Sequence, residues 1–204
     1  MSDRTLVVIS AGLSQPSSTR LLADQLAAAS RAEADALGLP LDTQVYELRD
    51  HAHDLTNHLL TGFPSESLKQ VIDAVAGADG LIAVTPIFNA SYSGLFKMFF
   101  DVIGDTTLVD KPVLIGATGG TERHSLALDH ALRPMFAYLR AVVVPTAVFA
   151  ASRDWAGAPA DGALRGRIQR AARELAGQIS LREPVTVADP FALSAPFEQL
   201  LGGE

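Results

Sequence analysis

Three short segments are rich in hydroxyl, amide and glycine residues, and each directly follows a short apolar run. The first, residues 10–19, contains Ser10, Ser17, Ser18 and Thr19 and leads into a stretch with helical periodicity. Hydroxyl groups, backbone N–H groups and the positive end of a helix dipole together make a seat for a phosphate group. The same residue types also cap helices, so this segment alone leaves both roles open.

The second segment, residues 85–94, combines polar groups with flat apolar ones. Pro86 is expected to end the preceding strand, because it has no N–H for the ladder, and so to free the backbone that follows. Asn89 and Ser91 offer polar side chains, and Phe88 offers an aromatic face beside a planar ring. A capping turn with its aromatic side chains in the core is the alternative. Ile87 and Ala90 complete the candidate binding residues of this segment.

The third segment, residues 118–125, contains Thr118 and the pair Gly119 and Gly120. Adjacent glycines permit close approach of a ligand to the backbone, or positive φ angles. His124 is able to meet a polar or anionic ligand, although a lone histidine in a loop is more often solvated or capping.

Other residues of the chain give only weak indications of a metal or nucleotide site. Three histidines lie near two aspartates at positions 50–58, but their spacing matches no standard metal site, and we interpret them as a polar surface turn. The chain has no G-x-G-x-x-G motif and no Gly-Lys-Ser/Thr motif, so neither a classical dinucleotide fold nor a P-loop is supported. We predict no metal site.

The elements that position these segments alternate along the chain. Apolar, β-branched runs predict strands over residues 5–9, 43–48, 81–85, 113–118 and 142–144. Amphipathic stretches predict a first helix that ends at Gly38 and further helices over about 65–76, 94–103, 125–140 and 164–179. This pattern predicts a parallel sheet with helices on both faces. Ligands bind outside the carboxyl ends of the strands of such a sheet, which is where the three segments are expected to meet.

Length and composition predict one ordinary domain. The chain has 204 residues, of which 48% are hydrophobic and 19% are charged, enough to bury a real core. We expect a domain over residues 1–182 and a C-terminal tail over 183–204, with three prolines, docked on this subunit or on a neighbour.

Several classes of function are disfavoured. With no cysteine, the chain has no disulfide, cysteine metal site or thiolate nucleophile, and it suits a reducing compartment. A net charge of −7 argues against a nucleic-acid surface. No apolar run approaches the roughly 20 residues that span a bilayer, and no signal peptide is visible, so we expect a cytoplasmic protein without a membrane partner.

Residues 86–97, together with residues 111–120 and 123–125, resemble the flavodoxin-like NADPH-dependent FMN reductase family, and the similarity extends over about residues 5–150. The first segment is less typical, because the family often has Gly-Ser followed by a basic residue where this chain has residues 11–14, Ala-Gly-Leu-Ser. The third segment is similar to an actinobacterial branch that supplies reduced FMN to luciferase-like monooxygenases. The resemblance implies an α/β, flavodoxin-like three-layer sandwich with a five-stranded parallel sheet in the order 2-1-3-4-5.

The function implied is NAD(P)H-dependent reduction of FMN, with FMN and NADPH or NADH as cofactors. The cofactors carry the hydride transfer, so no catalytic acid or base is expected, and the protein places the two rings. Reduced FMN would pass to a flavin-dependent monooxygenase, and the family likeness suggests a homodimer or homotetramer. The alternatives are a quinone or azo reductase that retains FMN, a flavodoxin-type electron carrier, and a flavin-free signalling domain on the same fold.

Overall fold

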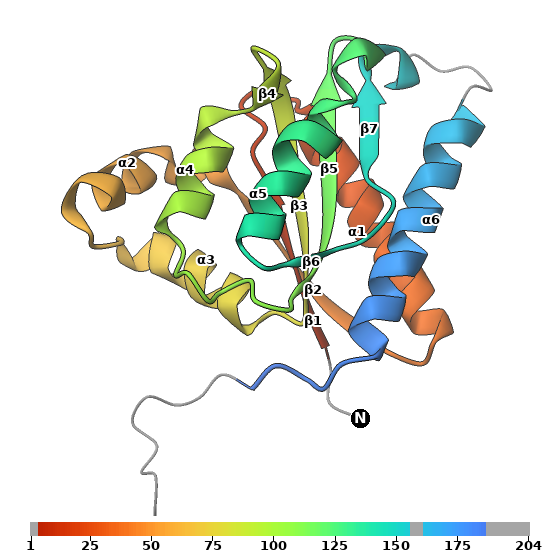
Figure 1. Ribbon diagram of the computed structural model, residues 1–204, viewed down its shortest axis with the longest axis horizontal. Coiled ribbons are helices and arrows are strands. Elements are labelled where there is room, and N and C mark those ends of the chain that lie inside the picture. Colours follow the sequence, from red (N-terminus) through yellow and green to blue (C-terminus); the bar gives the residue numbers. More distant parts are fainter. Residues whose placement is uncertain (1–3, 156–160, 187–204) are drawn as a thin grey trace, which may run out of the picture.

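A twisted, mainly parallel sheet forms the middle of the computed structural model, which describes residues 4–155 and 161–186 (Figure 1). The strands β1 (Arg4–Ser10), β2 (Leu41–Glu47), β3 (Gly80–Phe88) and β5 (Pro112–Gly119) pair in the order β2-β1-β3-β5. Two short strands, β6 (Val142–Val143) and β7 (Val148–Ala151), pair with the beginning and the end of β5. In the parallel part of the sheet, β5 is the fourth strand, and β6 and β7 together make an interrupted fifth. Counted in this way, the strands have the predicted order 2-1-3-4-5.

The strand count differs from the expected five. The strand expected at 142–144 stops after Val143 and resumes at Val148, because Pro145 interrupts it. The carbonyls of Val144 and Pro145 instead accept hydrogen bonds from Arg133, at 3.2 and 3.0 Å. A further strand, β4 (Ser91–Tyr92), pairs antiparallel with the end of β3, so the sheet has seven strand segments.

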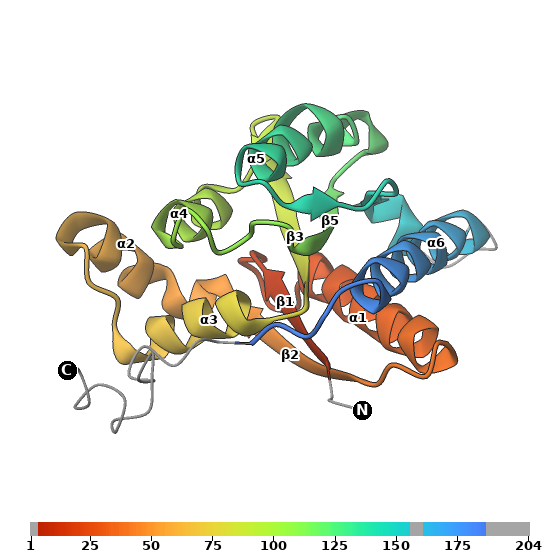
Figure 2. The same ribbon diagram turned by 60° about the horizontal axis from the view of Figure 1, so that its bottom comes forward.

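Helices α1 (Ser18–Ala36) and α6 (Asp161–Ser180) cover one face of the sheet (Figure 2). They bury an aliphatic cluster that includes Leu22, Leu26 and Ile179. The first helix ends as predicted, with Gly38 at a φ of 71°. At Gly80 a Cβ atom would lie 2.6 Å from Cδ1 of Ile179, so the end of α6 packs directly on the backbone of β3.

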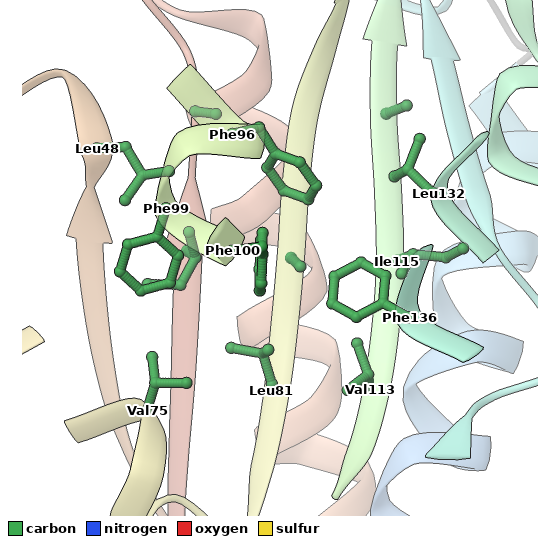
Figure 3. Close-up of a cluster of buried hydrophobic side chains, with 14 of the residues drawn as sticks. Leu48, Val75, Leu81, Phe96, Phe99, Phe100, Val113, Ile115, Leu132 and Phe136 are labelled. Atoms are coloured by element: carbon green, nitrogen blue, oxygen red, sulfur yellow. The ribbon is translucent and has the colours of Figure 1, made fainter. Parts of the chain in front are cut away.

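Helices α3 (Glu66–Gly77), α4 (Gly94–Val102) and α5 (Arg133–Tyr138) cover the opposite face. Four phenylalanines from α4 and α5 fill the space above the sheet: Phe96, Phe99, Phe100 and Phe136 (Figure 3). The Phe100 ring centroid lies 4.7 Å from that of Phe96 and 4.9 Å from that of Phe136. Burial of each such side chain contributes about 1.5–3 kcal/mol, so this cluster fixes α4 and α5 on the sheet.

Two helical predictions need correction. Residues 48–61 form a short 3₁₀ helix (Leu48–His51) and helix α2 (Ala52–Thr61) rather than a polar surface turn. Leu48 and Leu55 are fully buried and attach this helical segment to the core, while His53 is exposed and His51 and His58 are half-buried. The helix expected over 125–140 is irregular: a 3₁₀ turn (Glu122–His124) and a π-helical turn (Leu128–Leu132) precede α5.

The chain after α6 is held at the amino end of the sheet. Asp79 accepts a hydrogen bond from the Val185 N–H at 2.9 Å and forms an ion pair with Arg4, also at 2.9 Å. The predicted tail therefore begins against the domain, whereas its apolar residues 187–201 lie outside the described residues. None of the helices in the described ranges is long and apolar enough to cross a bilayer.

Candidate functional site

The first polar segment connects the carboxyl end of β1 to the amino end of α1. Ser17 is the N-cap of α1, and its hydroxyl accepts a hydrogen bond from the Arg20 N–H at 3.2 Å. Within residues 4–155 and 161–186, no hydrogen bond uses the N–H groups of residues 12–15 and 17–19. The loop thus has a row of free donors at the positive end of the helix dipole, which is the arrangement that binds an anion.

Gly12 lets this loop fold over the end of α1. A Cβ atom at Gly12 would lie 2.1 Å from Oγ of Ser17 and 3.1 Å from Cβ of Thr19. Any side chain there would push the N-cap serine away, so the shape of the loop depends on glycine at this position.

Three of the predicted hydroxyl groups lie beneath the loop. Ser10, Thr19 and Thr118 are 0%, 2% and 3% exposed, on the face of the sheet that α1 covers. The Thr19 and Thr118 hydroxyls are hydrogen-bonded at 2.8 Å and join the first segment to the third. The Ser10 hydroxyl has no partner among the described residues. A buried polar atom without a partner next to free N–H groups fits a site whose ligand supplies the missing contact.

The nearest cations are engaged by carboxylates. Arg20 donates to Asp24 at 2.8 Å and to Glu47 at 3.0 Å, and the hydrogen bond to Asp24 raises the pKa of Arg20. Arg49 reaches the loop from the far end of β2 and donates to the Ser14 carbonyl at 3.4 Å. Sequence reasoning missed the Arg49 contact, because 35 residues separate the two partners.

The second segment is a hairpin rather than an open loop. Pro86 pairs in register with Thr118, and β3 continues to Phe88, so the expectation that Pro86 ends the strand is wrong. Pro86 lies beyond the last pair of β3 with β1, where a missing N–H is tolerated. Asn89 and Ala90 have φ angles of 48° and 69°, the left-handed pair of a two-residue hairpin turn.

The tip of this hairpin is exposed, and its base is hydrogen-bonded to the sheet. Phe88 is 47% exposed, which excludes the alternative of a core position for that ring. Tyr92 is half-buried against Phe96, with ring centroids 6.0 Å apart. The Ser93 N–H donates to the buried hydroxyl of Thr85 at 3.0 Å, which fixes the base of the hairpin to the sheet. The tip therefore projects from a rigid support at the carboxyl edge (Figure 1).

In the third segment, close packing rather than unusual backbone geometry explains Gly119, whereas a Cβ atom at Gly120 would meet no atom within 4 Å. Neither Gly119 nor Gly120 has a positive φ angle. A Cβ atom at Gly119 would lie 3.0 Å from Cζ of Phe149 and 3.8 Å from Cδ2 of His124. His124 is exposed, and its ring lies beside the end of β5.

A cavity of about 790 Å³ adjoins this third segment. Glu122 and Ser125 line it on one side, and Phe149, Arg153 and Arg167 on the other. Its volume is within the range of about 300–1,000 Å³ that small-molecule sites occupy. Among the described residues, no group of three or more potential metal ligands is present.

The structure therefore brings all three predicted segments to one edge of the sheet. A doubly wound sheet in the order 2-1-3-4-5, with a donor-rich loop after its first strand and a hairpin after its third, defines a flavodoxin-like protein.

Comparison with known proteins identifies the family. The profile of the NADPH-dependent FMN reductase family matches residues 4–156. The chain is 41% identical over 152 residues to an FMN reductase (NADPH) of Pseudomonas aeruginosa, covering 74% of this chain and 78% of that protein. It is 39% identical over 168 residues to the NADH-dependent FMN reductase SfnE of Pseudomonas putida, covering 82% and 88%.

Two solved oxidoreductase structures are similar to this chain over most of its length. An oxidoreductase of Corynebacterium diphtheriae superposes with a TM-score of 0.87 at 47% identity, covering 90% of this chain and 100% of that one. The apo form of the NADH:FMN oxidoreductase EmoB superposes with a TM-score of 0.76 at 29% identity, covering 92% and 96%. The chain belongs to the NADPH-dependent FMN reductase family and is an NAD(P)H-dependent FMN oxidoreductase.

Proposed function

We propose that this reductase takes up oxidised FMN, reduces it with NADH or NADPH, and releases it to a flavin-dependent monooxygenase. When bound, the nicotinamide and the flavin supply the hydride transfer themselves. The protein's part is to bind both molecules and to place their rings against each other. The observation that supports release is the phosphate seat, which has free N–H groups and hydroxyls but no uncommitted cation within the loop.

The binding residues divide by position. We propose that the loop N–H groups, Ser17 and Ser18 hold the terminal phosphate, and that Ser10 turns its unpaired hydroxyl toward the same seat. The buried pair Thr19 and Thr118 keeps the seat in register with the ring loops. The flavin ring is placed against the hairpin and the third segment, by Pro86, Ile87, Phe88, Asn89, Ala90, Ser91, Gly119, Gly120 and His124.

We place the nicotinamide nucleotide on the side of the third segment, with the adjoining cavity as room for the rest of the molecule. The cavity wall holds Arg153 and Arg167 for the nucleotide phosphates, although Arg153 is paired with Glu122 at 2.8 Å. We also propose a homodimer or homotetramer, because Leu126, beside the third segment, and Tyr138, at the end of α5, are 63% and 86% exposed. A cytoplasmic location is proposed with it, since that is where reduced nicotinamide nucleotides are regenerated.

One experiment separates release from retention. The protein is saturated with FMN, desalted, and assayed for NAD(P)H oxidation with no addition, with added FMN, and with a quinone. We expect the desalted protein to be colourless and its turnover to need added FMN, with saturation as the FMN concentration rises. A yellow protein that turns over with quinone alone would support the FMN-retaining quinone or azo reductase instead. Bound FMN without nicotinamide oxidation would support the electron carrier.

A further inference from the structure

A weakly held cation, Arg49, lies beside the loop between β1 and α1. It belongs to the 3₁₀ turn Leu48–His51, which directly follows β2. Glu47, the last residue of β2, pairs in register with Ser10, the last residue of β1, so this turn begins next to the loop. Leu48 is fully buried and anchors the turn to the core. The backbone of Arg49 is therefore fixed close to the phosphate seat.

The contacts of the Arg49 guanidinium are long. Nη1 donates to the carbonyl of Ser14 at 3.4 Å, beyond the range of about 2.7–3.2 Å that such hydrogen bonds prefer. Nε lies 3.5 Å from Oδ1 of Asp50 and 3.8 Å from Oε2 of Glu47. It is buried, and among the described residues no atom accepts a hydrogen bond from it. A buried charged donor without an acceptor is costly, so a better acceptor would be favoured at this position.

Arg20, near the start of α1, is held more firmly. It donates to Asp24 at 2.8 Å and to Glu47 at 3.0 Å, so both contacts are with charged acceptors at normal distances. To meet a ligand, Arg20 would have to give up contacts of this kind. Arg49 would give up only its hydrogen bond to a neutral carbonyl, and a phosphate oxygen is a stronger acceptor than a carbonyl oxygen.

We propose that Arg49 binds the phosphate of FMN and makes the enzyme select FMN over riboflavin, which has the same ring system without the phosphate. When FMN binds, the guanidinium leaves the Ser14 carbonyl and donates to phosphate oxygens, which its planar fork suits. The N–H groups of the loop bind the other side of the same phosphate. This inference rests on the proposal that the loop between β1 and α1 holds the phosphate.

The carboxylates near Arg49 limit the strength of this contact. Arg20 and Arg49 share three acidic neighbours, Asp24, Glu47 and Asp50, so the cluster of two arginines and three carboxylates is negative overall. Directed hydrogen bonds from Arg49 then favour a flavin with a phosphate over one without it. The negative charge of the cluster keeps FMN exchangeable, as its release requires.

The affinities for FMN and riboflavin test this role directly. Dissociation constants of both flavins would be measured by fluorescence titration in the wild type, in Arg49→Gln and in Arg49→Lys. In Arg49→Gln, we expect the constant for FMN to rise by about 10- to 100-fold and that for riboflavin to stay within about twofold. Arg49→Lys keeps the charge but loses the fork, so it should give an intermediate value. The affinity for FMN should also depend less on salt concentration in Arg49→Gln, because one screened charge is missing.

Arg31→Gln is the matched control, because it removes the same charge from an exposed position. Arg31 lies on α1, 12 residues beyond Thr19, or about 18 Å along the helix. This distance exceeds the Debye length of about 8–10 Å at moderate salt. Both dissociation constants should therefore match those of the wild type.

Each contrary outcome has a distinct meaning. Equal affinity of the wild type for the two flavins would overturn both this inference and the placement of the phosphate in the loop. A preference for FMN that Arg49→Gln retains in full would overturn the role of Arg49 alone, as would an equal loss in Arg31→Gln. A parallel loss of affinity for both flavins in Arg49→Gln would overturn it too, because Arg49 would then support the shape of the site. Circular dichroism checks that each variant is folded.

Discussion

Gly12 is the residue on which the phosphate seat depends most strictly. In Gly12→Ala the new Cβ atom would lie 2.1 Å from Oγ of Ser17, so the loop must open and the helix cap must move. We expect FMN affinity to fall by about tenfold or more, equivalent to about 1.4 kcal/mol or more. Isothermal titration measures the change.

Two variants control for this result. Gly177→Ala adds the same methyl group in α6, where no atom lies within 4 Å, and should leave FMN affinity unchanged. Ser17→Ala alone removes one proposed phosphate contact and the cap without introducing the clash, so it should lower FMN affinity by less than Gly12→Ala. Unaltered FMN binding in Gly12→Ala would show that the ligand phosphate lies elsewhere.

Asn89 is placed at the tip of the hairpin, and its amide can be tested apart from its backbone. Asn89→Gly keeps the φ angle of 48° accessible but removes the side chain, so folding should persist while flavin affinity or turnover falls. Ala90→Gly, at a φ of 69°, relieves a left-handed alanine but frees the unfolded chain, so it should stabilise the fold by up to about 1 kcal/mol while keeping the Asn89 amide. Thermal unfolding and FMN titration of both variants provide the comparison. Full activity per folded molecule in Asn89→Gly would reduce Asn89 to a turn residue.

At the scale of elements, the hydroxyl pair Thr19 and Thr118 connects α1 to β5. Thr118→Val leaves the buried Thr19 hydroxyl without its partner, which should cost about 1–3 kcal/mol of unfolding free energy. The Thr19→Val/Thr118→Val double variant should be less destabilised than the sum of the two single variants, because both polar groups are removed together. Urea unfolding gives the three values. Strict additivity would mean that the two hydroxyls do not interact.

Lys111 connects β5 to the end of α3, donating to the carbonyls of Ala76 and Ala78 while only 6% exposed. Burial lowers the pKa of Lys111 to about 8 from its ordinary value of 10.5. Between these two pH values the unfolded chain binds more protons than the folded one, so stability rises with pH across that window. Below pH 8 both states are protonated, and the contribution is constant at its least favourable value.

We therefore expect the stability of the wild type relative to Lys111→Met to increase from pH 7.5 to pH 10.5, by up to about 3 kcal/mol. Comparison with this variant cancels the titration of all other groups. Chemical denaturation at closely spaced pH values makes the measurement, and a difference that stays flat across the window would show that Lys111 titrates normally.

The elements that the sequence predicted well are those with strong periodicity. The apolar runs at β1, β3 and β5 and the amphipathic faces of α1, α3, α4 and α6 depend on local spacing, which one sequence displays. Helix α2 was missed because only Leu55, with Leu48 just before the helix, is fully buried, while Leu59 and Leu60 are exposed and blur the amphipathic pattern. The hairpin at Asn89 was missed because its turn needs positive φ angles at Asn89 and Ala90, and alanine rarely adopts them.

At the scale of the whole molecule, the meeting of the three segments was predictable because the topology of a parallel sheet brings the carboxyl ends of its strands to one edge. What the sequence could not show are contacts between distant residues. The burial of Ser10 and the bond between Thr19 and Thr118 follow from the packing of α1 on the sheet, across a separation of 99 residues in the latter case. The contact of Arg49 with the Ser14 carbonyl likewise joins residues that lie 35 positions apart in the sequence.

We expect this edge of the sheet to position FMN for reduction by a nicotinamide nucleotide. The most direct test mixes the purified protein anaerobically with FMN and stoichiometric NADPH or NADH and follows flavin absorbance near 450 nm. We expect the flavin absorbance to bleach only when the protein is present, at a rate that saturates with FMN and falls in Gly12→Ala. Absorbance that stays constant with both nucleotides, in protein shown by circular dichroism to be folded, would contradict it.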